Sequence, residues 1–316
     1  MIEPLRGLVT LGETMGLLSA TEIGPLRHCS TMSISMAGSE SNVSIGVRRL
    51  GVPAEWIGRI GPDEFGEIIL RELRAEGVVA HAVVDEAPTG LMLKERRISG
   101  LTRVSYYRTH SAGSRLCPSD IQEAAVAGAG VLHVTGLTLA LGTQPAAAVR
   151  TALDIAEGAH VPISFDVNYR AALWTANAAR PVLRSLLGSV DIVFAGAQEA
   201  QLLVDATEPT DLARGIAKLG PSQVVIMRGS AGATALIDGE LHDVPAIPVD
   251  CVDPVGAGDA FVAGYLSQLL KGSPPNRRLD TAARAGAFAV SAIGDWQGLP
   301  RYDELGLLGA DDRVLR

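Results

Sequence analysis

The sequence predicts an α/β fold in which helices cover both faces of a mostly parallel sheet, with a small second β-sheet beside it. Short apolar runs bounded by turn residues recur along the chain, and longer segments of helical periodicity lie between most of them. This alternation is typical of a parallel sheet covered by helices. Two strand-like stretches near the N-terminus break the alternation and predict the second sheet. With 316 residues, of which 47% are hydrophobic, the chain can bury a large core.

The apolar runs are the predicted strands of the main sheet. They lie at residues 8–11, 131–135, 162–165, 191–194, 224–227 and 234–237. The segments between them contain good helix formers, and the predicted helices include 67–76, 145–157, 178–187 and 199–205. Ligands of such sheets bind beyond the carboxyl ends of the strands, so polar residues that follow a strand are candidates for a site.

The smaller sheet is predicted from residues 30–36, which alternate polar and apolar side chains, and from 89–97 and 103–109. The last two have the pattern of strands joined by a turn at Ser99 and Gly100. Because an α/β segment separates these stretches, we expect one lid sheet inserted into a single large domain, residues 1–316. The lid strands are expected within about 14–37 and 88–110.

A glycine turn flanked by carboxylates precedes an apolar helical pattern at residues 253–261, where the sequence is DPVGAGDAF. Gly256 and Gly258 lack a Cβ, so the backbone can bend tightly and bring several N–H groups to one point at the positive end of the next helix. This arrangement predicts an anion site. The carboxylate of Asp259 is unfavourable there unless it has a task, such as accepting a proton from a hydroxyl that attacks a phosphoryl group. The combination indicates a kinase.

Polar residues also gather at the start of a predicted amphipathic helix within 37–51. A turn at Gly38 and a helix cap at Ser39 or Ser41 would explain most of them. Asn42 lies in the first turn, where its amide can reach a ligand hydroxyl. For Asp63, in the loop before another predicted helix, a capping role is the preferred interpretation.

Another polar group follows the predicted strand 162–165. Asp166, Asn168, Tyr169 and Arg170 should lie at the carboxyl end of this strand, the edge at which ligands bind. A surface pair between the aspartate and the arginine is the alternative. The asparagine and the arginine at this edge favour a binding role.

Other candidates have a structural explanation beside the functional one. Arg108 shares a strand face with Tyr106, and its guanidinium suits a substrate carboxylate, although packing is the usual role of such a strand. The glycine-rich turn 228–233 has the pattern of a plain hairpin. Glu199 at a helix start can favour the helix dipole or bind Mg²⁺, and Asp295 can be an exposed loop acid.

Composition and spacing argue against several classes of protein. The net charge is −8 and no run of lysine or arginine exceeds two residues, so no nucleic-acid partner is expected. The N-terminal residues have no uninterrupted apolar run, so we expect neither a signal peptide nor a membrane partner. The expected location is therefore the cytoplasm. The three cysteines and six histidines lack disulfide or metal-site spacing. No dinucleotide-binding glycine fingerprint follows the first strand, which argues against a nicotinamide-dependent oxidoreductase.

Three segments together resemble the two signatures of the ribokinase-like (PfkB) carbohydrate kinase family. They are AGSESNVSIGVRRLG at 37–51, IGRIGPDEFG at 57–66 and DPVGAGDAF at 253–261. The resemblance covers nearly the whole chain, and two signatures in this order are far more specific than a lone glycine pattern. Within the family, YYRTHSAGSRL at 106–116, FDVNYRAALW at 165–174 and GDWQGLP at 294–300 look like 2-keto-3-deoxygluconate kinases.

The resemblance implies a ribokinase-like three-layer α/β/α sandwich with a β-lid, ATP as the phosphoryl donor and Mg²⁺ as a cofactor. It leaves a requirement for a monovalent cation open. Family members often dimerise through the lid, so a homodimer or a higher homo-oligomer is expected.

The resemblance also implies roles for the candidate residues. Those implied to contact the sugar are Gly38, Asn42, Tyr106, Arg108, Arg170, Asp259 and Asp295, with Tyr106 and Arg108 near its carboxylate end. Asp259 is implied to be the base, and the amides of Gly256, Ala257 and Gly258 the anion hole for the moving phosphoryl group. Those implied to lie at the nucleotide are Asn168, Arg228, Gly229 and Gly232. Glu199 is implied to act on Mg²⁺, through water.

Two positions depart from the family pattern. Met92 stands where 2-keto-3-deoxygluconate kinases commonly have a tyrosine, so one sugar contact is missing or replaced. The magnesium-associated Asn-x-x-Glu of the family begins here with Gly196 and retains only the acid, Glu199.

The sequence therefore predicts an ATP-dependent kinase for a primary hydroxyl of an acidic keto-deoxy sugar, with 2-keto-3-deoxygluconate as the expected substrate. Arg108 and Arg170 motivate the acidic substrate, since a neutral sugar needs no guanidinium. A kinase for another sugar, such as fructose, ribose or tagatose phosphate, is the nearest alternative. A non-catalytic sugar- or nucleotide-binding protein is the second.

Overall fold

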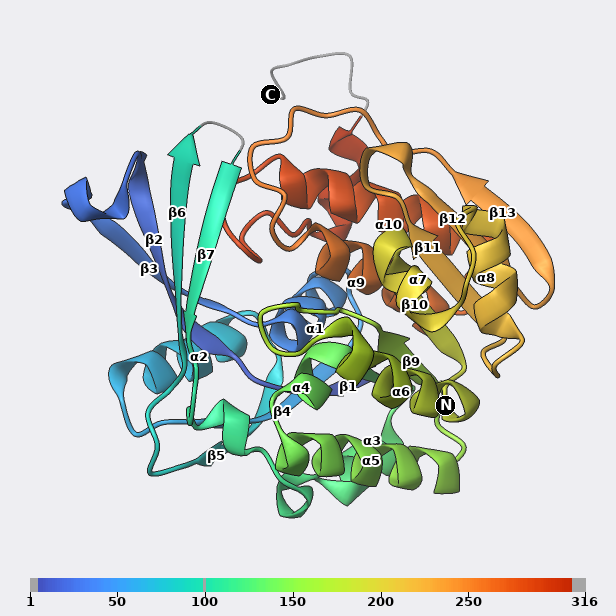
Figure 1. Cartoon of the computed structure of the whole chain (residues 1–316), viewed down its shortest axis with the longest axis horizontal. Coiled ribbons are helices and arrows are strands. Elements are labelled where there is room, and N and C mark those ends of the chain that lie inside the picture. The colour runs from blue at the N-terminus through green and yellow to red at the C-terminus, as the bar shows by residue number, and fades with distance from the viewer. Residues whose placement is uncertain (1–4, 99–100, 309–316) are drawn as a thin grey trace.

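The structure, a computed structural model, describes residues 5–98 and 101–308. Figure 1 shows a main body of sheet and helices, and a lid of strands, drawn in blue and teal, that projects from one side of it. The predicted fold class is confirmed. Over the described ranges, no helix is both long and apolar enough to cross a membrane.

Nine strands of the described residues form the large sheet. In spatial order they are β13 (Glu240–Val244), β12 (Ala233–Ile237), β11 (Gln223–Met227), β10 (Ile192–Gly196), β9 (Ile163–Asp166), β8 (Val131–Thr135), β1 (Leu8–Leu11), β4 (Ala54–Ile60) and β5 (Val79–Val84). The pairs from β11 to β5 are parallel, whereas β12 and β13 pair antiparallel. The six predicted strands are all present, and the sheet continues beyond them at both edges.

The strand residues alternate between two apolar faces of this sheet. Leu8 packs on one side, while its neighbours Val9 and Leu11 pack on the other. The helices on the first side are α1 (Ser39–Arg49), α2 (Glu64–Ala75), α9 (Ala257–Leu270) and α10 (Pro275–Val290). Those on the second side are α3 (Glu123–Gly128), α5 (Thr143–Gly158), α6 (Ala176–Leu186), α7 (Ala197–Leu203) and α8 (Pro209–Ala217), and α4 (Gly136–Ala140) links β8 to α5. The result is the expected α/β/α layering.

The described residues also form short 3₁₀ helices. They are η1 (Leu26–His28), η2 (Gly113–Arg115), η3 (Pro118–Asp120), η4 (Leu187–Ser189), η5 (Gly229–Ala231) and η6 (Tyr302–Leu307).

The lid contains β2 (Met15–Ile23), β3 (Met32–Ala37), β6 (Leu91–Ile98) and β7 (Leu101–Tyr107), in the order β3-β2-β6-β7. Its outer pairs are antiparallel and its central pair, β2 with β6, is parallel. Met15, Leu17 and Met92 bury a small apolar cluster on one face. The predicted turn at Ser99 and Gly100 lies outside the described residues.

The parallel strands place several polar residues on one edge of the large sheet. Glu13 follows β1, Asp166 ends β9, and Glu199 lies in the first turn of the helix that follows β10. The N-terminus of α9 carries the loop that is predicted to bind phosphate, residues 253–258, which we call the phosphate loop. This edge, which faces the lid in Figure 1, positions the candidate site.

Candidate active site

Two adjoining cavities lie between the lid and the carboxyl edge of the large sheet. The larger, about 420 Å³, is lined by the phosphate loop, lid residues and the ends of β9 to β11; the smaller, about 70 Å³, is lined by the lid and the start of α1. Both are lined by Met92, Tyr106, Arg170, Val255, Gly256 and Asp259. The phosphate loop therefore separates a larger compartment from a smaller one, an arrangement that suits two ligands.

Asp259 lies at the junction of the two cavities, in the first turn of α9. Its Oδ1 accepts a hydrogen bond of 2.6 Å from the Ser39 hydroxyl, and its Oδ2 accepts one of 2.8 Å from Asn42 Nδ2. Burial raises the pKa of Asp259 to about 6, although both hydrogen bonds favour the ionised form. The carboxylate is therefore held in place and is poised to gain or lose a proton near neutral pH.

Ser39 joins Asp259 to the end of β9. Its hydroxyl accepts a hydrogen bond of 2.8 Å from Asn168 Nδ2 while it donates to Asp259. Asn168 has a left-handed backbone, with φ of 37°, which an asparagine tolerates better than most residues. Helix α1, β9 and α9 are thus connected through three side chains that are far apart in the sequence.

The phosphate loop is shaped by Gly256. Its φ is 80°, and a Cβ at this position would lie 2.0 Å from the carbonyl oxygen of Asp295. Gly258 differs, because a Cβ there would meet no atom within 4 Å. The predicted tight turn therefore occurs at Gly256, whereas Gly258 lies within α9 and its position does not require a glycine. Gly256, Ala257 and Gly258 line the larger cavity at the start of α9, where the first N–H groups have no intrahelical acceptor.

Asp295 lies against this loop and lines the smaller cavity. Burial, followed by the negative charge of Asp259, raises the pKa of Asp295 to about 6. Its side chain is 8% exposed, so it is not the exposed loop acid of the structural alternative. Two buried acids with raised pKa values share one cavity.

The guanidinium of Arg108 is already paired. Arg108 is 7% exposed, and its Nε and Nη2 lie 2.7 and 2.5 Å from Oε2 of the buried Glu13. Ser111 also hydrogen-bonds to Glu13, and the guanidinium lies 5.7 Å from the centre of the Tyr106 ring. The sequence did not reveal this ion pair, which offsets the charge of Arg108 but leaves part of its donor fork for a ligand.

Arg170 lines both cavities and is exposed. Within residues 5–98 and 101–308, no carboxylate lies within ion-pair distance of it. Its charge acts on the acids around it by lowering the pKa of Asp259 and of Asp166. The surface Asp–Arg pair that was the alternative is therefore absent from the described structure, and Arg170 is the arginine with a free guanidinium at the site.

Asp166 and Glu199 form a pair of acids on the wall of the larger cavity. Burial, then the charges of Glu199 and Asp259, raise the pKa of Asp166 well above its usual range. Glu199 accepts backbone hydrogen bonds of 2.8 Å from Tyr169 and 2.7 Å from Gly196, so it caps α7 as the structural alternative required.

These two acids fit Mg²⁺ better than a metal held by protein alone. No group of three or more His, Cys, Asp or Glu side chains suited to a metal ion occurs in the part of the chain that the structure describes. Mg²⁺ usually keeps several waters and binds one or two carboxylates together with substrate phosphates. Each Glu199 oxygen retains a lone pair after its backbone hydrogen bond.

The predicted nucleotide turn is a hairpin between β11 and β12, the structural alternative for this segment. Arg228 donates to Asp243 on β13 at 2.7 Å, and its backbone N–H bonds to the Gly232 carbonyl. Arg228, Gly229 and Gly232 do not line either cavity, although the preceding Met227 lines the larger one. Asp63 caps α2, as expected, by accepting from the Gly66 N–H at 2.9 Å.

Sequence reasoning missed four residues that the structure brings to the site. Ser39 was expected only to cap a helix, and Glu13 was not among the candidates. Glu40 is fully buried in the first turn of α1, where Thr135 and Thr138 donate to it, and burial raises its pKa. Lys94 forms a buried ion pair with Asp253 at the start of the phosphate loop. For Lys94 the available signal was a charged residue next to the apolar residues 91–93, which does not identify its partner.

Known proteins resemble this chain over most of its length. Residues 6–301 match the pfkB family of carbohydrate kinases. The 2-dehydro-3-deoxygluconokinases of Thermoproteus tenax and Bacillus subtilis strain 168 are each 38% identical to this chain over 304 residues. These alignments cover 94% of this chain and 92% and 93% of the two relatives.

A solved structure shows the same fold with ligands. An Escherichia coli protein provisionally named ribokinase II, in complex with ATP and Mg²⁺, superposes with a TM-score of 0.90 and 27% identity. The superposition covers 96% of this chain and 99% of that one.

Proposed function

The chain belongs to the pfkB family of carbohydrate kinases, and on that premise we propose that it phosphorylates a primary hydroxyl of 2-keto-3-deoxygluconate with ATP. The two relatives at 38% identity, which carry the equivalent name 2-dehydro-3-deoxygluconokinase, support this sugar acid. The observation that carries the catalytic part is Asp259, oriented by Ser39 and Asn42 between a small cavity and the N-terminus of α9.

In the proposed reaction Asp259 is the base. One of its oxygens accepts the proton of the sugar hydroxyl as that oxygen attacks the γ-phosphorus of ATP. The bond from the γ-phosphorus to the bridging oxygen breaks, and ADP leaves with the electron pair. The amides of Gly256, Ala257 and Gly258 donate to the transferred group at the positive end of α9, where negative charge needs stabilisation.

The sugar acid would occupy the smaller cavity. Gly38 and Asn42 line it at the start of α1, and Asp295 can accept hydrogen bonds from sugar hydroxyls. Arg170 would bind the substrate carboxylate directly, because its guanidinium has no other ion-pair partner among the described side chains. Tyr106 and the remaining donors of Arg108 would add contacts at the same end.

The nucleotide would occupy the larger cavity. Asn168 lines it, and Asp166 and Glu199 would hold Mg²⁺, Glu199 through water. Bound Mg²⁺ supplies positive charge that neutralises the phosphates. Arg228, Gly229 and Gly232 would approach the nucleotide from the hairpin next to Met227, outside the cavity wall.

We further propose that residues 1–316 act as one domain and that the chain forms a homodimer through the lid. Ile34 and Tyr107 on lid strands are 60% and 65% exposed, as are Ile98 and Leu101 at 59% and 54%, which supports a covered lid surface in the assembly. Use of ATP and the three free cysteines support a cytoplasmic location.

A coupled ATP-turnover assay tests the substrate. We expect kcat/KM for 2-keto-3-deoxygluconate to exceed the values for its stereoisomer 2-keto-3-deoxygalactonate and for fructose, ribose and tagatose phosphate. A preference for a neutral sugar would contradict the proposal. Binding of ATP and sugar without turnover would favour the non-catalytic alternative. Comparing K⁺ with a bulky organic cation in the same assay tests the monovalent-cation requirement.

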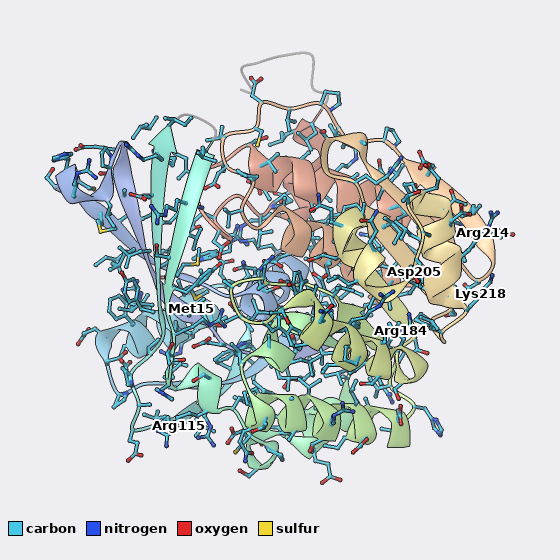
Figure 2. All side chains as sticks on the ribbon, in the orientation of Figure 1. Met15, Arg115, Arg184, Asp205, Arg214 and Lys218 are labelled. Carbon is cyan, nitrogen blue, oxygen red and sulfur yellow. The ribbon has the colours of Figure 1, made fainter. Side chains whose placement is uncertain are left out.

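Two variants test the assigned roles. Asp259→Asn should lower kcat by about 10²- to 10⁴-fold, because the amide cannot accept the proton. Arg170→Gln should lower kcat/KM for the sugar acid by about 10- to 100-fold, the loss of one charged hydrogen bond, and should affect a neutral sugar much less. Arg214→Gln is the matched control, because Figure 2 shows Arg214 at the far side of the molecule from the lid.

A further inference from the structure

Lys94 places an ammonium group from the lid inside the protein. It lies on β6 and is 3% exposed, although lysine is almost never fully buried without a partner. Its Nζ lies 2.5 Å from Oδ2 of Asp253, which is 1% exposed, and 3.2 Å from the carbonyl oxygen of Gly294. The other lysines of the chain, Lys218 and Lys271, are not part of the site.

The two partners of Lys94 lie at the start of the two loops that form the site. Asp253 begins the phosphate loop, and its Oδ1 accepts a hydrogen bond of 3.2 Å from the N–H of Val255. Gly294 immediately precedes Asp295, and its N–H lies 3.4 Å from Oδ2 of Asp253. One ammonium and one carboxylate thus connect the lid to both loops.

The loops are in direct contact beyond this point. A Cβ on Gly256 would lie 2.0 Å from the carbonyl oxygen of Asp295, so neither loop can move toward the other. A second lid contact reaches the same region, because Gln297 Nε2 donates to the Ser35 hydroxyl on β3 at 2.6 Å. That contact is exposed, whereas the Lys94–Asp253 pair is buried and is the stronger candidate for holding the loops.

The positive charge of Lys94 also compensates the buried negative charge of Asp253. Without it, the Asp253 carboxylate would be a buried, uncompensated negative charge at the start of a loop that has to bind phosphate. The charge of Asp253 raises the pKa of Asp295 and that of Lys94 lowers it, which agrees with both groups acting on the catalytic loops.

We propose that Lys94 is a positioning residue whose ammonium group acts as a built-in cation. It connects the lid to Asp253 and Gly294, and through them it fixes the position of the phosphate loop relative to the Asp295 loop. This inference deepens the proposed kinase function and rests on it. It predicts that turnover does not depend on an added monovalent cation at this place, because the ammonium of the chain occupies it.

Replacement of Lys94 tests the proposal. Lys94→Ala should lower kcat by about 100-fold, the cost of a small misplacement of catalytic groups, while KM for ATP and for the sugar changes far less. Added methylammonium or ammonium should restore part of the lost kcat, because the truncated side chain leaves room beside Asp253. Lys94→Arg should keep more activity than Lys94→Ala.

A second readout needs no turnover. Hydrogen exchange of residues 253–258 and 294–297 should become faster in Lys94→Ala than in the wild-type chain. If Lys94→Ala does not fold, the double variant Lys94→Met with Asp253→Asn removes both charges, and we expect it to fold while kcat stays low. Lys218→Ala is the matched control, since Lys218 is exposed and Figure 2 shows it on the opposite side of the molecule from the lid.

An unchanged kcat, or unchanged protection of the two loops, would overturn the proposal. The assay uses whichever sugar the wild-type chain phosphorylates best, so an unexpected sugar preference does not affect the result for Lys94. If the wild-type chain phosphorylated no sugar, the proposed function would fail, and the hydrogen exchange of the loops would still decide whether Lys94 holds them.

Discussion

Asp259 is subject to two opposing influences at the scale of a single residue. Burial disfavours its ionised form, while hydrogen bonds from Ser39 and Asn42 favour it. Burial has the larger effect, and the pKa rises from 3.8 to about 6. A base with such a pKa is mostly ionised at pH 7 and is more basic than an exposed aspartate, which suits proton abstraction from a hydroxyl.

The raised pKa predicts how activity depends on pH. Protonated Asp259 cannot accept the hydroxyl proton, so kcat/KM should fall about tenfold for each pH unit below about 6. A pH profile of kcat/KM measured with a saturating fixed ATP concentration checks this. An acidic limb centred near 4 would contradict the raised pKa.

The raised pKa makes activity increase with pH, but it makes the stability of the folded state decrease with pH. Between the unfolded value of 3.8 and the folded value of about 6, the folded state holds a proton on Asp259 that the unfolded state has lost. This contribution to stability is complete below about pH 4 and is lost as the pH rises through about 6, and Asp295 behaves in the same way. At neutral pH the two ionised acids therefore lower the stability of the fold.

Ser39→Ala tests the effect of one hydrogen bond on the pKa of Asp259, because the variant keeps the Asp259 carboxylate. Removing the hydroxyl takes away one donor that favours ionised Asp259, so the acidic limb of the kcat/KM profile should move up by about one pH unit. Ser41→Ala is the matched control in the same helix, because the Ser41 hydroxyl bonds to the Gly38 carbonyl and not to Asp259. Equal pH profiles for the two variants would contradict the role of Ser39.

At the scale of elements, the site depends on how α9 begins. The helix starts after a left-handed residue, Gly256, that packs on the loop of Asp295, while α1 brings Ser39 and Asn42 to the same point. Local sequence explains each element: apolar side chains on the sheet-facing sides of α1 and α9, and a glycine where φ is positive. It does not explain why the two helix starts meet.

A pair of glycine variants tests the geometry of this helix start. Gly256→Ala should lower the free energy of unfolding by about 1–3 kcal/mol or more, because the new Cβ is strained at positive φ and overlaps the Asp295 carbonyl. Gly258→Ala should leave it within about 1 kcal/mol, since its Cβ would meet open space at the start of a helix. Urea unfolding of both variants provides the comparison, and equal losses would contradict the distinction.

The two faces of the lid differ in the residues that they carry. Its inner face carries Tyr106 at the site and the buried Met92, the departure from the common tyrosine. Met92 lines both cavities, so at the proposed sugar site it would offer an apolar contact in place of a phenol.

At the scale of the whole molecule, the exposed lid residues lead to a prediction about assembly. Sedimentation should give a homodimer. Ile34→Glu should shift the equilibrium toward the monomer, because dimer formation would then bury a charged side chain in an apolar interface. Val79→Glu, an exposed apolar residue on β5 of the large sheet, is the control and should leave the assembly unchanged. A monomeric wild-type chain would contradict lid dimerisation.

The sequence by itself determined the fold class, because the spacing of apolar runs and helical segments requires a parallel sheet with helices on both faces. It also located the turn at Gly256 and the acid at Asp259, since the two residues are close together in the chain. The edge strand β13 was less accessible, because its residues are mostly polar and none of them is buried.

Only the tertiary structure decided which side chains meet. Ser39 and Asp259 are 220 residues apart, Glu13 and Arg108 are 95 apart, and Lys94 reaches Asp253 from the lid. A charged residue in a sequence carries no mark of its partner, because the pairing depends on how loops from separate strands pack at one edge. The packing assigned Arg108 to Glu13 and Lys94 to the phosphate loop, and it left Arg170 as the unpaired arginine among the described residues of the site.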